Sequence, residues 1–237
     1  MTEAYKSFGI VKKAIVSETI DINVVNLWSF VGDDGRIDDA PYGGGPGMVL
    51  KIEPILRGIK TVKNIAQSGE GSQTIVINTN PQGKRFTQTD AEKLASFNHV
   101  ILVAGRYQGV DERLSQFVDF EYSIGDFVLG GGDLAALSIL DSVVRIIPGV
   151  IGDKGSLQDE SFNKSLLGYP QFTRPESVHG LKVPEVLLSG DHDKVKKWRR
   201  KQRLGLTYKR RRDLFEDSEL NAEDMVLLEQ YIDEHGK

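Results

Sequence analysis

The chain has 237 residues, of which 39% are hydrophobic, a net charge of −4 and no cysteine. Its length suffices for one domain with a smaller second one, and the lack of cysteine excludes disulfides, zinc–thiolate sites and a thiol nucleophile for attack on a pyrimidine ring carbon. Because no apolar run reaches the roughly 18 residues of a membrane span and no signal peptide precedes the first polar residues, we expect a cytoplasmic protein.

Three glycine-dense segments are the most informative feature of the chain: PYGGGPGM (41–48), GRYQGVDER (105–113) and SIGDFVLGGGD (123–133). Glycine lets a backbone turn sharply and approach a ligand closely, so three such loops indicate one small-molecule pocket. For any single glycine, a role as a turn former is the simpler interpretation. The loops lack the Lys-Ser/Thr ending of a Walker loop and a GxGxxG that opens a helix, so a nucleotide phosphate is not the expected ligand.

Two short β-branched runs, residues 74–78 and 99–104, predict buried parallel strands whose C-terminal ends hold the ligand. Between them, the stretch from Thr89 to Glu92 predicts the capping box of a helix, which gives the β-α-β alternation of an α/β domain. Further along, Asp133 is expected to cap a long helix that is apolar on nearly every face and therefore buried.

Residues 152–168 are polar, punctuated by glycine and without clear periodicity, so they predict a mobile linker. This linker separates an expected ligand-binding domain, residues 1–151, from an expected helical domain, residues 169–237. In the second domain, the sequence pattern predicts helices at residues 192–204 and 221–235.

A strongly basic block lies in the expected second domain. Residues 194–212 contain 11 basic side chains among 19 positions and no acidic one. Such a block attracts polyanions through the release of counterions, and Trp198 and Tyr208 within it are able to stack on bases. The alternative is a solvated helix face. Because no acidic residue interrupts the block, we favour nucleic acid as the partner.

Nine segments, in order along about four fifths of the chain, resemble bacterial tRNA (guanine-N1)-methyltransferase, the TrmD family. They are the three glycine loops together with NPQG, DSVVRIIPGV, ESF, YPQFTRPE, VPEVLLSGDH and WRRKQRLGLT. The resemblance implies an α/β SPOUT fold with a parallel sheet and a trefoil knot, which is a rare exception to the rule that chains do not thread themselves. It also implies S-adenosylmethionine as methyl donor, magnesium as a further candidate cofactor, and a homodimer that methylates N1 of tRNA guanosine 37.

Methyl transfer to N1 of guanine needs a base near N1 and a donor to the negative charge that develops on O6. By resemblance the base is Glu160, where the family has an aspartate before Ser-Phe, and the donor is Arg145. Glutamate is one methylene longer than aspartate, which displaces its oxygens in a preorganised site. Asp159 is the alternative base.

The resemblance also implies residues that bind the cofactor and the substrate. The cofactor contacts are expected from Gly105, Tyr107, Ile124, Gly125, Asp126, Phe127, Val128, Leu129 and Gly131. The target guanine is expected to contact Pro41, Tyr42, Gly43 and Gly44, and the rest of the tRNA is expected to contact Lys209, Arg210 and Arg211. No residue is assigned to a metal ion.

Besides Glu160, the chain departs from the family pattern at further places. Gln108 stands where the family usually has glutamate, residues 78–80 replace a more apolar run, and we expect the family's first strand to be missing because the chain opens on MTEAYKSFG. A non-catalytic tRNA-binding protein of the same fold is therefore an alternative, as is methylation of another RNA site. The presence of the glycine loops together with Arg145 and Glu160 favours the enzyme.

Overall fold

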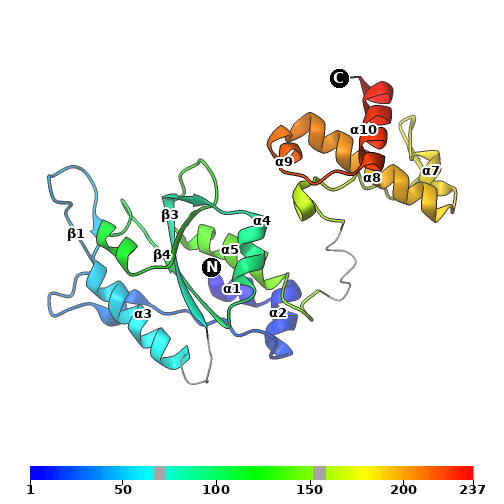
Figure 1. The fold of residues 1–237 in the computed structure, drawn as a ribbon. Coiled ribbons are helices and arrows are strands. Elements are labelled where there is room, and N and C mark those ends of the chain that lie inside the picture. Colours follow the sequence, from blue (N-terminus) through cyan, green and yellow to red (C-terminus); the bar gives the residue numbers. More distant parts are fainter. Residues whose placement is uncertain (67–72, 152–158, 237) are drawn as a thin grey trace. The chain divides into compact units, whose positions relative to one another are not determined.

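A computed structural model describes residues 1–66, 73–151 and 159–236. The chain divides into two units, Met1–Gly152 and Asp153–Lys237 (Figure 1). The first seven residues of the linker that we expected at 152–168, residues 152–158, lie outside the described residues. Among the described helices, none is long and apolar enough to cross a membrane.

A three-stranded parallel sheet forms the centre of the first unit, in the order β4-β3-β5. Its strands are β3 (Thr74–Arg85), β4 (His99–Ala104) and β5 (Phe120–Ser123). Ile77 of β3 lies opposite Leu102 of β4 and Phe120 of β5. Both strands predicted from the sequence are confirmed. β3 is longer than predicted because its second half, after a register shift between Thr79 and Lys84, continues to pair with β5.

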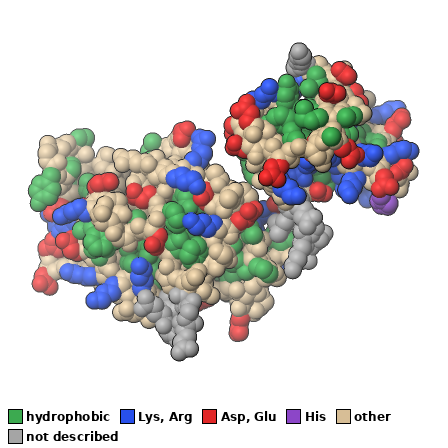
Figure 2. Space-filling view, viewed as in Figure 1, with side chains coloured by type: hydrophobic (Ala, Val, Ile, Leu, Met, Phe, Trp, Pro, Cys, Tyr) green, Lys and Arg blue, Asp and Glu red, His purple; other side chains and the backbone are tan. Residues whose placement is uncertain are grey.

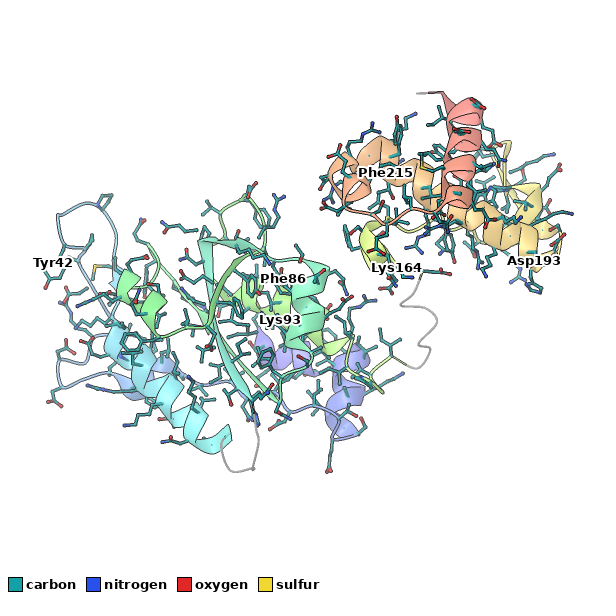
Figure 3. All side chains as sticks on the ribbon, viewed as in Figure 1. Tyr42, Phe86, Lys93, Lys164, Asp193 and Phe215 are labelled. Atoms are coloured by element: carbon teal, nitrogen blue, oxygen red, sulfur yellow. The ribbon has the colours of Figure 1, made fainter. Side chains whose placement is uncertain are left out.

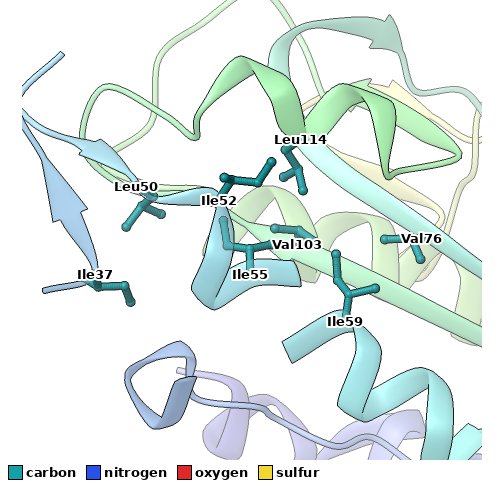
Figure 4. Packing of buried hydrophobic residues seen from close by; sticks show 8 residues of the cluster. All are labelled: Ile37, Leu50, Ile52, Ile55, Ile59, Val76, Val103 and Leu114. Atoms are coloured by element: carbon teal, nitrogen blue, oxygen red, sulfur yellow. The ribbon is translucent and has the colours of Figure 1, made fainter. Parts of the chain in front are cut away.

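Helices cover both faces of this sheet. The other elements of the unit are α1 (Thr2–Lys6), α2 (Gly9–Val16), η1 (Leu27–Phe30), β1 (Asp38–Asp39), β2 (Val49–Leu50), α3 (Ile52–Ala66), α4 (Gln88–Leu94), η2 (Glu112–Gln116) and α5 (Asp133–Val144). Val76 packs with Ile55 and Ile59 of α3 on one face (Figure 4). Its neighbour Ile77 packs on the other face against α4 and α5, including Ile139. Because helices bury both faces of the sheet, successive residues of its strands are apolar instead of alternating with polar ones.

Two predicted helix caps are wrong by one or two positions. The capping box of α4 joins Thr87 to Asp90: Asp90 N donates to Thr87 Oγ1 at 3.4 Å and Thr87 N donates to Asp90 Oδ2 at 3.0 Å. The predicted pair, Thr89 and Glu92, does not form the cap, because the helix begins earlier. Asp133 is the first residue of α5 rather than its cap. Its carboxylate instead pairs with Arg106 at 2.9 Å.

The burial predicted for α5 is confirmed in part, because four of its 12 residues, Ala135, Ile139, Val143 and Val144, are buried. Ile139 is fully buried in the cluster against the sheet, and Val144 is buried in another cluster with Val11 and Ala14 of α2. The first turn differs, because Leu134 remains 48% exposed. α5 therefore joins the sheet to the first two helices of the chain.

The second unit is mainly helical. Its elements are η3 (Asn163–Ser165), β6 (Ser177–Val178), β7 (Leu181–Lys182), α7 (Glu185–Leu188), α8 (His192–Arg210), α9 (Arg212–Glu216) and α10 (Ala222–His235). Leu204 of α8 packs with Leu227 and Leu228 of α10 and with Leu166. Both predicted helices are confirmed, and α8 extends six residues further than predicted. The parallel α/β sheet and the helical C-terminal region are thus as the sequence indicated.

Candidate functional site

A pocket of about 420 Å³ lies at the carboxyl ends of β4 and β5 and beside residues 78–82 of β3, where the register of that strand shifts. This is the position at which open parallel sheets bind ligands. Its wall contains eight of the nine predicted cofactor residues, namely Gly105, Tyr107, Ile124, Gly125, Phe127, Val128, Leu129 and Gly131. The ninth, Asp126, does not line the pocket, and its carboxylate pairs with Arg85 at 3.0 Å.

Direct backbone contacts hold the second and third glycine loops against each other. Gly132 N donates to Gly105 O at 2.7 Å. A Cβ at Gly132 would lie 2.5 Å from Thr79 Oγ1 and 2.9 Å from Gly105 N, so a larger residue would force the loops apart. Tyr107 adopts a left-handed φ of 60° in the adjoining turn, which Gly109 N closes by donating to Arg106 O. These contacts give the pocket wall a defined shape.

The loop after β5 presents apolar side chains at the pocket. Ser123 Oγ donates to Gly125 O at 3.1 Å, and Phe127 N donates to the same oxygen at 3.0 Å. In this turn Phe127 and Val128 remain 55% and 91% exposed. Exposed apolar groups beside a pocket mark a surface that a ligand or a partner covers.

A carboxylate that sequence reasoning missed lies in the same pocket. Asn78 Nδ2 and Asn80 Nδ2 both donate to Glu121 Oε1, at 2.8 and 3.0 Å. All three residues line the pocket. Both asparagines belong to residues 78–80, the run that departs from the family pattern. This departure was the signal in the sequence that could have pointed to a polar partner, such as Glu121, on the adjacent strand. The held carboxylate gives the pocket a negative charge that suits a cationic ligand.

A buried carboxylate fixes the strand that bears Glu121. Burial raises the pKa of Asp90, but hydrogen bonds from Lys84, Thr87 and Tyr122 outweigh it and lower the pKa below its usual value. Tyr122 OH donates to Asp90 Oδ1 at 3.1 Å. Burial, together with the Asp90 charge, raises the pKa of Tyr122 to about 12. This network ties the start of α4 to β5 directly beside the pocket.

The first glycine loop does not line the pocket, contrary to the expectation that all three loops converge there. It connects β1 to β2, and the side chain of Tyr42 is fully exposed at its outer edge (Figure 3). Pro41, Gly43 and Gly44 lie in the same part of the loop, away from the residues that line the pocket. Its C-terminal part contacts the second loop, where Gln108 N donates to Met48 O at 3.0 Å and a Cβ at Gly47 would lie 2.6 Å from the Gln108 side chain.

The two predicted catalytic residues belong to different units, so their meeting in one site stays a prediction. Arg145 directly follows the last residue of α5 in the first unit, and its backbone N–H donates to Asp141 O at 3.2 Å. Glu160 lies in the second unit, in the segment before η3. The alternative base, Asp159, already accepts a hydrogen bond from Tyr169 OH at 3.1 Å.

Carboxylates from other parts of the chain compensate most of the positive charge of the basic block. Seven of its 11 cations have a carboxylate within 4.0 Å, namely Lys194, Lys197, Arg200, Lys201, Arg203, Arg211 and Arg212. Basic and acidic side chains accordingly intermingle over the second unit (Figure 2). The partners lie outside the block in sequence, and three of them lie on α10, which packs along α8. Among the described residues, the block's other cations, Lys196, Arg199, Lys209 and Arg210, have no carboxylate within that distance.

The two aromatic residues of the block already have partners within the chain. Trp198 lies beside Phe172, with ring centroids 6.2 Å apart. The guanidinium of Arg212 lies 3.9 Å from the centre of the Tyr208 ring, and Phe215 packs on that ring edge-on. Stacking of these rings on RNA bases would therefore compete with contacts inside the unit.

No metal site is evident in the part of the chain that the structure describes, where no group of three or more His, Cys, Asp or Glu side chains is arranged to hold an ion. We assign no step of a reaction to a metal.

Comparison with known proteins agrees with the pattern of loops and strands. A family profile described as tRNA (Guanine-1)-methyltransferase TrmD matches residues 1–217. A tRNA (guanine-N(1)-)-methyltransferase of Sulfurihydrogenibium sp. is 49% identical over 232 residues, which cover 98% of this chain and 89% of that protein. Proteins of the same name from Dictyoglomus turgidum and Tolumonas auensis are 47% and 44% identical, over 94% and 99% of this chain and 88% and 93% of theirs. The chain therefore belongs to the TrmD family of tRNA (guanine-N1)-methyltransferases, which depend on S-adenosylmethionine.

Proposed function

We propose that this enzyme methylates N1 of guanosine 37, next to the anticodon of tRNA, with S-adenosylmethionine bound in the pocket of the first unit. The observation that carries the proposal is the convergence of two glycine loops, which follow β4 and β5, with residues of the NPQG segment in β3 at one pocket. The pocket's volume of about 420 Å³ falls within the range of about 300 to 1,000 Å³ that small-molecule sites occupy.

The residues of the pocket fit the proposed cofactor. When bound, S-adenosylmethionine supplies an electrophilic methyl group on a positively charged sulfur. Ile124, Phe127 and Leu129 offer apolar contacts, and the loop at Gly105 offers backbone groups without a side chain in the way. The carboxylate of Glu121, held by two amide groups, suits a ligand with positive charge.

In the proposed reaction, Glu160 accepts the proton from N1 of guanine as the nitrogen takes up the methyl group. Arg145 offsets the negative charge that moves onto O6. Asp159 remains the alternative base; its Oδ2 accepts a hydrogen bond from Tyr169 and its Oδ1 lies 3.9 Å from Arg203. The first glycine loop, with Tyr42 exposed, is proposed to contact the target nucleotide.

We further propose the trefoil knot of the SPOUT fold and a homodimer with a shared active site. Family membership supports both. The exposed apolar residues Val128 and Leu134, beside the pocket and on the first turn of α5, are suited to burial against a second subunit. Light scattering of the purified protein should give twice the chain mass, and a monomer that is fully active would contradict the shared site.

Mass spectrometry of digested tRNA tests the reaction directly. Transcripts with guanosine at position 37 should acquire one methyl group at N1 when incubated with the enzyme and S-adenosylmethionine, whereas matched transcripts with adenosine 37 should not. Methylation of both transcripts would refute the site assignment. The same assay with a chelator tests whether magnesium is required.

A further inference from the structure

Arg203 of α8 is a buried arginine that donates hydrogen bonds to backbone oxygens and also lies 3.9 Å from the carboxylate of Asp159, the alternative base. Its exposed fraction is 9%. Its guanidinium donates to Leu167 O at 3.2 Å, Asn163 O at 3.2 Å and Glu160 O at 3.4 Å. Burial is the main cause that lowers the pKa of Arg203. Because a buried charge costs free energy unless its donors are satisfied, the contacts with these carbonyl groups make the burial possible.

The segment that carries these carbonyl groups forms some backbone hydrogen bonds of its own, such as Leu166 N to Asn163 O at 3.3 Å, and takes further donors from Arg203 of α8. Phe162, Lys164 and Ser165 have left-handed φ angles of 74°, 52° and 56°. A backbone with repeated left-handed residues cannot form a regular helix or strand, so its polar groups require other partners. The planar guanidinium of Arg203 carries five N–H donors and can therefore serve several carbonyl groups at once.

A second α8 residue, one turn after Arg203, binds the same segment. Thr207 is fully buried. Its Oγ1 accepts a hydrogen bond from Leu167 N at 2.9 Å and donates to Arg203 O at 2.6 Å. Leu166 packs on Leu204 in the core of the unit. Residues 203, 204 and 207 of α8 thus hold residues 159–168 through polar and apolar contacts together.

We propose that Arg203 is a positioning residue for methyl transfer, which holds the segment of Glu160 on α8 and so presents the Glu160 carboxylate in one orientation. This inference rests on the proposed function, in which Glu160 is the base. α8 also carries Lys209 and Arg210, which are proposed to bind tRNA. The base therefore belongs to the same body as the RNA-binding helix, so its alignment depends on how that helix holds the segment.

Single-turnover methyl transfer at saturating tRNA and cofactor tests this role in the full chain. Arg203→Met keeps the bulk of the side chain and removes the donors. Its rate should fall about 100-fold, the loss typical of a misplacement of about 1 Å. The dissociation constants for tRNA and S-adenosylhomocysteine should stay near those of the unmodified enzyme. Arg203→Lys should recover part of the rate.

Asp224→Asn is the matched control. It removes a buried ion pair between α8 and α10, in which Asp224 binds Arg200 at 2.7 Å, and it does not contact residues 159–168. It should lower the melting temperature but leave the saturated rate unchanged. Amide hydrogen exchange over residues 160–167 should increase in Arg203→Met and not in the control.

Three results would overturn the inference. If Arg203→Met reacts as fast as the unmodified enzyme while Glu160→Gln is inactive, Arg203 has no positioning role although the proposed base stands. An active Glu160→Gln would instead remove the base assignment and this inference with it. If Arg203→Met does not fold, Arg203→Lys and Thr207→Val provide the test, and unmodified rates in both would contradict the role.

Discussion

The close contact of Gly132 with two neighbouring segments allows a sharp test of the pocket. In Gly132→Ala, the new Cβ would lie 2.5 Å from Thr79 Oγ1, 2.9 Å from Gly105 N and 3.0 Å from Ala104 Cα. Favourable contacts between heavy atoms need roughly 3.5 Å, so the loop must move by about 0.5 to 1 Å. Because two of the three atoms belong to the backbone, rotation of a side chain cannot relieve the overlap.

The expected loss follows from that movement. Overpacking of this kind costs about 1 to 3 kcal/mol, and the shift also strains the 2.7 Å hydrogen bond from Gly132 N to Gly105 O. Because this free energy destabilises the loop conformation that binds the cofactor, S-adenosylhomocysteine should bind about 5- to 150-fold more weakly in calorimetry. Gly130→Ala is the control, because no atom lies within 4 Å of its Cβ. Equal affinity in both variants would refute the role given to this loop contact.

Three further predictions concern the base, the RNA and pH. Glu160→Gln should slow single-turnover methyl transfer by about 10²- to 10⁴-fold at unchanged cofactor affinity, and a larger effect of Asp159→Asn would move the base to that residue. Replacing Lys209 and Arg210 by glutamine should reduce the slope of log affinity for tRNA against log salt by about 1.4 to 1.8, or 0.7 to 0.9 per phosphate contact, whereas an unchanged slope would exclude them from the interface. Because hydrogen bonds lower the pKa of Asp90 in the folded state, its stabilising effect is complete above the ordinary carboxyl pKa of about 4 and disappears as the pH falls through the lowered value. Thermal unfolding between about pH 6 and pH 3 should therefore show a loss of stability that is smaller in Asp90→Asn, and parallel curves for the two proteins would contradict this.

The central strands and the pocket were predictable because local patterns determine them. Residues 74–78 and 99–104 are short apolar runs, and such runs become parallel strands when both faces are covered. The glycine segments that follow or neighbour them mark the carboxyl ends of the sheet. From these facts alone, a ligand site at the loops near Gly105 and Gly125 was a direct expectation, and the structure places both residues in one pocket.

The parts that were not predictable depend on contacts between distant segments. The cap of α4 lies at Thr87 because Asp90 also binds Lys84 and Tyr122, and Tyr122 is 32 positions away in sequence. The role of Glu121 depends on two amide side chains of a neighbouring strand. A periodicity or a local motif carries no information about such partners, so these polar networks appear only in the folded chain.

The ion pairs of the basic block also depend on contacts between distant segments, and they affect how the enzyme is expected to bind tRNA. Charges of α8 that pair with α10 already have counterions within the protein, so they release few others when tRNA binds. Lys209 and Arg210 at the end of the helix are exposed and have no carboxylate within 4.0 Å in the described part of the chain, so they are the strongest candidates for contact with phosphate. They lie six and seven residues after Arg203, a distance of about 9 to 10 Å along an α-helix. Since Arg203 holds the segment of Glu160, a tRNA bound at the end of α8 and the proposed base are connected by two turns of one helix. A substitution that loosens this segment should therefore reduce the rate of the bound complex more than the binding of either substrate.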